Sequence, residues 1–113
     1  MQFLMLIYRD RVPVPAEASA GPAGSAVESW VRRMDERGTR LAGNPLAPDD
    51  EAVTVRVRSD SNQVDEGAFL DTAGALLGFD LLDCRDQDEA IAVAAEHPLA
   101  LRHVLELRPI ASD

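Results

Sequence analysis

Apolar and polar residues alternate along several short stretches of the chain, and this pattern predicts its strands. Residues 2–8, QFLMLIY, are apolar on both alternating faces, which is typical of a strand covered on each side of a sheet. In residues 52–58, AVTVRVR, the pattern predicts a core-facing side made by Val53, Val55 and Val57 and a polar side that carries the arginines. Three further strands are predicted at residues 39–46, 75–84 and 102–110.

Two segments between these strands carry helix signals. Ser25 and Glu28 have the spacing of a capping box, which predicts that a helix begins there. The apolar stripe that follows at helical spacing, and that we expect in the core, consists of Val27, Trp30, Val31 and Met34. Asp86 and Glu89 repeat the capping spacing and predict a second helix over residues 87–96.

The remaining segments are predicted as loops. Residues 9–24 contain three prolines and two glycines without any helical or strand period, which indicates a mobile surface insertion, with a lid as the alternative. Residues 59–63, SDSNQ, have the composition of a turn, because their side-chain oxygens can accept hydrogen bonds from nearby backbone donors.

The order of these elements is strand, helix, two or three strands, helix, strand, in one domain over residues 1–113. This order predicts an α+β fold, the ferredoxin-like arrangement of an antiparallel sheet with two helices on one face. The other sheet face would then be uncovered. Because the strand at residues 2–8 is apolar on both faces, we expect a homodimer that forms through that sheet face.

Charge excludes several classes of partner. Twenty carboxylates against eleven arginines, with no lysine, give a formal net charge of −9. Nucleic acids and anionic membranes gain affinity from clustered positive charge, so neither is expected as a partner. Without lysine the chain has no Walker P-loop, no Schiff-base nucleophile and no anchor for pyridoxal phosphate. No cofactor is therefore expected.

The N-terminal residues and the single cysteine indicate a location. One cysteine cannot form a disulfide within the chain, and the N-terminus does not resemble a signal segment. The longest apolar run, FLMLIY, is too short to span a bilayer. We expect a cytoplasmic protein.

Six segments in order resemble the motifs of the YCII-related proteins that carry the DGPF domain. They are MLIYRD (5–10), GTRLAGNPLAP (38–48), TVRVR (54–58), DEGAFLDT (65–72), GFDLLDCRDQDEAI (78–91) and LELRPI (105–110). The resemblance implies a dimeric α/β barrel of ferredoxin-like subunits, each with a cleft near the motif. Some YCII-related proteins are thought to be enzymes with a His–Asp pair, but no histidine of this chain lies at a position to which that pair could be transferred. The DGPF branch is largely without assigned chemistry and is often found beside alternative sigma factors.

The name motif of the branch is altered in this chain. Aligned with Asp-Gly-Pro-Phe and the five residues that follow it in the family, the chain has Glu66, Gly67, Ala68, Phe69, Leu70, Asp71, Thr72, Ala73 and Gly74. The proline, the lysine and the last carboxylate of the motif are therefore replaced.

Glu66 and Asp71 are the candidate catalytic residues. They are five apart across a glycine, so they could meet in one pocket as general acid and base. The alternative is structural: Gly67 sets a backbone angle, Phe69 fills the core, and the two acids cap local donors or face water.

Other polar residues receive structural interpretations. His103 is expected as a buried, hydrogen-bonded histidine, and His97 as a cation at a helix end without a chemical role. Cys84 is expected to be buried. No metal site is expected from the acidic run, which we interpret as caps and a solvated face and which consists of Asp80, Asp83, Asp86, Asp88 and Glu89.

Three functions remain open. The first is a homodimeric small-molecule binding or accessory module, the second a weak acid–base enzyme of lyase or hydrolase type, and the third a purely structural dimer. An enzyme needs Glu66 or Asp71 in a partly enclosed cleft, whereas a binding module needs only an apolar pocket.

Overall fold

A computed structural model describes residues 1–12, 23–70, 72 and 74–111. In chain order its elements are strand β1 (Gln2–Arg9), helix α1 (Ala23–Glu36), strand β2 (Arg40–Pro45), the short 3-10 helix η2 (Asp49–Glu51), strands β3 (Val53–Arg58), β4 (Ser61–Glu66) and β5 (Leu76–Asp83), helix α2 (Gln87–Ala95), the short 3-10 helix η3 (Pro98–Leu101) and strand β6 (His103–Pro109).

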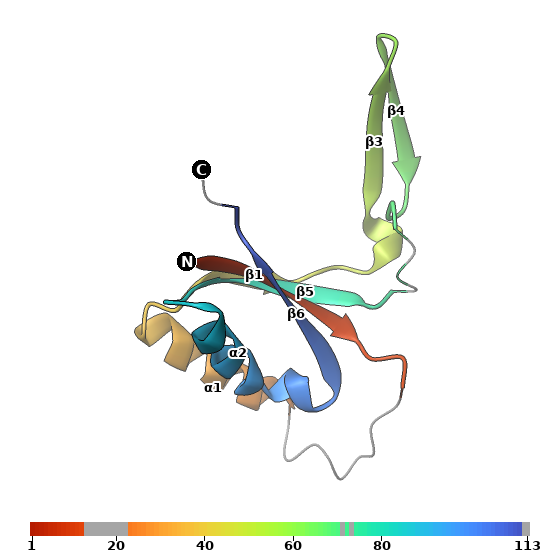
Figure 1. Ribbon diagram of the computed structural model, residues 1–113. Helices are drawn as coiled ribbons and strands as arrows, with labels where there is room; N and C mark the ends of the chain where they lie inside the picture. The colour runs from red at the N-terminus through yellow and green to blue at the C-terminus, as the bar shows by residue number, and fades with distance from the viewer. Residues whose placement is uncertain (13–22, 71, 73, 112–113) are drawn as a thin grey trace.

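Four strands form one antiparallel sheet in the order β2-β5-β1-β6. Both helices lie on one face of this sheet (Figure 1). The predicted ferredoxin-like α+β fold is thereby confirmed. Strands β3 and β4 form a separate two-stranded sheet, which projects from the four-stranded sheet on the side opposite the helices (Figure 1).

The core lies between the sheet and the helices. From β1, Phe3, Met5 and Ile7 are buried on the helix side. Trp30 of α1 is fully buried, as predicted, and its indole N–H donates a hydrogen bond of 3.1 Å to the carbonyl oxygen of Val93 in α2. This bond joins the two helices inside the core, where an unpaired indole N–H would be unfavourable.

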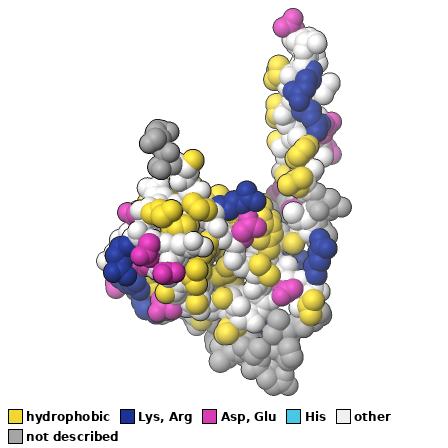
Figure 2. Space-filling model, in the orientation of Figure 1, with side chains coloured by type: hydrophobic (Ala, Val, Ile, Leu, Met, Phe, Trp, Pro, Cys, Tyr) yellow, Lys and Arg dark blue, Asp and Glu magenta, His cyan; other side chains and the backbone are white. Residues whose placement is uncertain are grey.

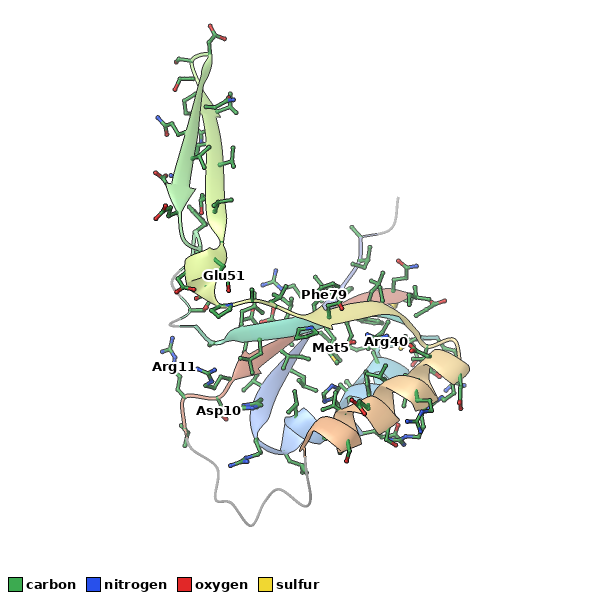
Figure 3. The ribbon with its side chains drawn as sticks, turned by 180° about the vertical axis from the view of Figure 1, so that it is seen from behind. Met5, Asp10, Arg11, Arg40, Glu51 and Phe79 are labelled. Carbon is green, nitrogen blue, oxygen red and sulfur yellow. The ribbon has the colours of Figure 1, made fainter. Side chains whose placement is uncertain are left out.

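The other sheet face has no helix over it among the described residues. It carries the half-buried side chains Leu4, Leu6, Phe79 and Leu81, two from β1 and two from the neighbouring β5. Figure 3 shows Met5 on the helix side and Phe79 on the opposite side of the sheet. We call this surface the open face and define it by those four residues. Its apolar character agrees with the reading of β1 as a strand with two apolar faces.

The capping predictions hold in part. Asp86 accepts a hydrogen bond of 2.9 Å from the backbone N–H of Glu89, as expected for an N-cap. The Glu89 carboxylate accepts from the N–H of Arg85 instead of that of Asp86. The predicted start of the first helix is wrong: α1 begins at Ala23, so Ser25 lies inside it.

The region of β3 and β4 differs most from the prediction. The expected turn at 59–63 is only two residues long, with positive φ at Ser59 and Asp60, and β4 follows directly. Two positive φ angles characterise the type I′ turn of tight hairpins. Four strands therefore separate the helices in sequence, not two or three. Residues 13–22 of the predicted loop lie outside the described residues.

Strand β3 was expected to bury one face in the core, and this expectation is wrong. Val53, Val55 and Val57 are 63%, 59% and 59% exposed, because the hairpin lies beside no helix and no other strand in the described structure.

Among the described residues, no helix is long and apolar enough to cross a membrane.

Candidate functional site

A cavity of about 360 Å³ lies on the helix side of the sheet, between α1, β2, β5 and the chain around η3. Its wall is mostly apolar, with Ile7, Val27, Val31, Leu77 and Leu99 as the main hydrophobic residues. The polar side chains that reach it from buried positions are those of Arg40, Asp80 and His97.

Arg40 and Asp80 form a largely buried ion pair. The Nε–H of Arg40 donates to Asp80 Oδ1 at 2.8 Å, and the side chains are 15% and 7% exposed. The other two guanidinium nitrogens donate to Asp35 Oδ1 at 3.1 Å and to the Gly43 carbonyl oxygen at 2.9 Å. Figure 3 shows Arg40 at the edge of the sheet beside α1. The guanidinium therefore joins α1, β2 and β5 at one end of the cavity.

Burial and pairing act in opposite directions on the two charges. Burial raises the pKa of Asp80, and the hydrogen bond from Arg40 opposes that change. For Arg40, burial would lower the pKa, but the hydrogen bonds to Asp80 and Asp35 raise it overall. The arginine stays charged at neutral pH, and its charge is balanced by two carboxylates.

Gly43 makes room for this ion pair. A Cβ atom at position 43 would overlap Asp80 Oδ1 and lie 2.7 Å from the carbonyl oxygen of Phe79. Any side chain there would force the pair apart, because the Phe79 carbonyl belongs to the neighbouring strand and cannot move freely. The glycine of β2 therefore allows a carboxylate and a guanidinium to lie against the strand.

His97 is buried against Trp30 and is neutral. It is 2% exposed, and the centres of the two rings are 4.5 Å apart. Its Nδ1 accepts a hydrogen bond of 3.0 Å from the backbone N–H of Leu99, so the neutral ring carries its proton on Nε2. Burial lowers the pKa of His97 to about 4. The prediction of a cation at this position is wrong, because burial disfavours the charged form.

Of the predicted catalytic pair, the structure places one member. Glu66 is the last residue of β4, is exposed, lies opposite Val53 in the hairpin and is not part of the cavity wall. Asp71 lies outside the described residues. Whether the two carboxylates meet stays a prediction.

Within the altered motif, Gly67 has a clear structural role. Gly67 has φ of +98°, which confirms that it sets a backbone angle. Its N–H donates to the Ala52 carbonyl oxygen at 2.7 Å, and its own carbonyl accepts from the Thr54 hydroxyl at 2.9 Å. Phe69, expected in the core under the structural interpretation, is instead 69% exposed, with the Arg56 guanidinium carbon 5.3 Å from its ring centre. That part of the interpretation is wrong.

The remaining candidates separate into confirmed and incorrect predictions. Cys84 is 3% exposed, and burial raises the pKa of its thiol, which fits a structural residue. His103 is half-buried, and its Nδ1 has no hydrogen-bond partner among the described residues. Asp80 is neither a cap nor on a solvated face. Within the described part of the chain, no three potential metal ligands lie together.

Sequence reasoning did not find the cavity. Its charged residues are forty positions apart, at Arg40 and Asp80, and they meet only because β2 pairs with β5. One signal was present: Asp80 interrupts the apolar run of the strand, and a carboxylate among buried residues needs a partner.

The fold and the cavity define a ferredoxin-like α+β protein with a pocket between its first helix and its sheet. The profile of the YCII-related domain matches residues 1–112, so the chain belongs to the YCII-related family. No curated protein matches the sequence.

A comparison with solved structures finds 5-chloro-2-hydroxyhydroquinone dehydrochlorinase from Burkholderia phenoliruptrix, in complex with 2,5-dihydroxybenzoquinone. The two chains are 11% identical, the match covers 100% of this chain and 96% of that one, and the TM-score is 0.49.

Proposed function

We propose that the protein is a homodimeric small-molecule binding module, and that the cavity beside the Arg40–Asp80 pair holds a compact, mostly apolar and uncharged ligand. The observation that carries this proposal is the cavity itself. Its volume of about 360 Å³ falls at the small end of the range of roughly 300–1,000 Å³ for ligand pockets. An apolar wall with a few fixed polar groups is also the usual composition of such sites.

The charges at the cavity favour an uncharged ligand. Arg40 lies between Asp80 and Asp35, so this cluster has one more negative charge than positive charge. A carboxylate ligand would be repelled by the surplus. A cation would lose its hydration in the apolar cavity, and the surplus charge would compensate this only weakly, because Asp80 and Asp35 both share their charge with Arg40 and Asp35 is half exposed to water.

His97 supplies a hydrogen-bond donor of fixed identity. Because Nδ1 accepts from Leu99, the proton is on Nε2, and protonation of the ring is disfavoured above pH of about 4. A hydroxyl or carbonyl oxygen on the ligand would suit this donor. The expected ligand is thus an apolar body with one or two oxygen functions.

The dimer and the subfamily are parts of the same proposal. The open face, with Leu4, Leu6, Phe79 and Leu81, supports association through the sheet into a dimeric barrel, because large uncovered apolar patches usually mark interfaces. The order of the six motifs and the positive φ of Gly67 support the DGPF branch. A cytoplasmic location is part of the same proposal, and it is supported by the single cysteine, which cannot form a disulfide within the chain.

The test uses matched ligand pairs and matched variants. Backbone amide chemical shifts are recorded by NMR during titration with small aromatic alcohols and with the corresponding carboxylates. We expect the alcohols to shift resonances around the cavity and the carboxylates to bind at least tenfold more weakly. Val27→Phe fills the cavity from α1 and should abolish these shifts, whereas Ile91→Phe, at an exposed helix position away from this cavity, should not.

Three results would contradict the binding proposal. The carboxylates could bind more tightly than the alcohols, Val27→Phe could bind as well as the wild type, or the shifts could lie away from the cavity. Sedimentation tests the dimer separately, since a 12.2 kDa species at all concentrations would exclude it.

A further inference from the structure

The β3–β4 hairpin, which we call the arm (residues 53–66), has two different faces. Val55 and Val64 are paired across the arm, and Val53 and Val57 lie on the same side. All four are 59–63% exposed. On the opposite side, Arg56 forms an ion pair of 3.5 Å with Asp65 and lies over the Phe69 ring. The polar face therefore has contacts of its own, whereas the valine face lies open.

A hairpin of this kind is not stable by itself in water. Two-stranded hairpins are marginally stable unless another surface covers one face. Within the described structure the arm pairs with no other strand. The strict alternation of β3 is the pattern of a strand that buries its valines. A surface that covers the valine face must come from somewhere other than the helices of the same chain.

The position of the arm points to the space above the open face. The arm rises from the sheet on the side away from the helices (Figure 1). Figure 2 shows hydrophobic side chains along the edge of the arm that faces this space. The open face and the valine face thus border the same region, and none of their eight residues is charged.

The size of the exposed surface fits a second copy of the chain. A monomer of 12.2 kDa is expected to expose roughly 6,100 Å² and to have a radius of gyration of about 13 Å. The values here are 7900 Å² and 16.3 Å. The excess of about 1,800 Å² is that of the whole chain, of which the arm is one part, and it exceeds the roughly 800 Å² that each partner buries in an interface of standard size.

We propose that the arm is a clamp for a second copy of this chain. In this arrangement two chains stack with their open faces together about a two-fold axis. The arm of each chain extends along the other chain, and its valine face is buried against that chain. The contact is reciprocal, so both apolar surfaces of both chains are buried at once. This inference rests on the proposed homodimer and adds the arm as the part that holds the partner.

The test compares two adjacent residues on opposite faces of β4. Val64→Asp places a charge on the valine face, and Gln63→Asp places the same charge on the polar face. Sedimentation velocity between 1 and 100 µM, on the order of ordinary dimer affinities, gives the dissociation constant of each variant. Hydrogen exchange of residues 53–66 is followed over the same concentrations. Circular dichroism verifies that both variants keep the fold.

We expect the wild type to be a dimer, Val64→Asp to weaken it at least tenfold, and Gln63→Asp to change it less than threefold. Arm amides should exchange more slowly at concentrations where the dimer forms. If the dimer forms but both variants bind equally and the arm exchanges freely, the clamp is wrong and the dimer through the open face survives. A wild type that is monomeric throughout overturns both. Protection of the arm in dilute monomer would show that it closes on its own chain, which also overturns the clamp.

Discussion

Strands β1 and β3 each present an apolar row of side chains on one face, and only the row of β1 is buried within the chain. Phe3, Met5 and Ile7 of β1 are at most 7% exposed, whereas Val53, Val55 and Val57 of β3 are at least 59% exposed. The first set lies against two helices and the second against none.

The comparison shows what alternation does and does not predict. An apolar face indicates that a strand is to be covered, because exposed apolar surface is unfavourable in water. It does not indicate which surface provides the cover. For β1 the cover is α1 and α2 of the same chain, and for β3 we propose a second chain.

The largest expected difference between the two regions is in stability. Trp30→Ala should lower the free energy of unfolding by about 3–5 kcal/mol, because it leaves a cavity in the core and removes the bond to Val93. Val55→Ala should change it by less than about 0.5 kcal/mol in dilute monomer, as for other exposed residues.

Urea unfolding followed by circular dichroism measures both, since Trp30 is the only tryptophan and its fluorescence disappears in the first variant. A loss of 2 kcal/mol or more (roughly the cost of a buried residue) for Val55→Ala in the monomer would mean that the arm packs within its own chain.

The two cross-strand ion pairs make a second comparison. Asp80→Asn should lower the free energy of unfolding by about 3 kcal/mol, because it leaves the largely buried guanidinium of Arg40 without its closest counter-charge. Asp65→Asn removes the partner of Arg56 on the exposed arm and should cost less than about 1 kcal/mol.

Urea unfolding measures both aspartate variants. Equal decreases in the free energy of unfolding would contradict the conclusion that the Arg40–Asp80 pair is buried and the Arg56–Asp65 pair is exposed. Gly43→Ala provides an independent perturbation, since it disturbs the Arg40–Asp80 pair and keeps both charges.

Lowering the pH should lower the free energy of unfolding, because His97 is buried in its neutral form on the helix-covered side of the sheet. Its pKa is lowered by burial from 6.5 to about 4. As the pH falls through 6.5 the unfolded chain binds a proton that the folded chain excludes, so the free energy of unfolding falls. The fall levels off near pH 4, where the folded chain also binds the proton. The total loss is up to about 3 kcal/mol.

His97→Phe keeps an aromatic ring beside Trp30 and removes the titration, so the difference between wild type and variant isolates this histidine from the carboxylates that titrate in the same range. Urea unfolding at a series of pH values measures it. Parallel pH profiles of the two proteins would show that His97 is not excluded from its charged form.

The smallest expected effect is at Glu66. Because this carboxylate is exposed at the base of the arm, Glu66→Gln should change the free energy of unfolding by less than about 0.5 kcal/mol. NMR titration of the Glu66 carboxyl in wild type and Asp71→Asn tests the acid–base hypothesis. A midpoint that changes with the substitution would establish a coupled site, and an unchanged midpoint would remove the basis for an enzyme at this motif.

The sequence by itself determined the strands of the main sheet, both helices, the burial of Trp30 and the backbone role of Gly67. These depend on local patterns: alternation, helical spacing, and a glycine where φ is positive. The two-residue turn and strand β4 were not predicted, because Ser59 and Asp60 both adopt positive φ and neither residue type indicates this strongly.

Only the tertiary structure decided where the cavity and the exposed valines lie. Arg40 and Asp80 meet through the pairing of β2 with β5, and Gly43 matters because of what lies across from it. His97 is neutral because the fold buries it, with the ring of Trp30, sixty-seven positions earlier, packed against it. Burial, pairing and pKa depend on neighbours in space, and local sequence patterns do not contain those neighbours.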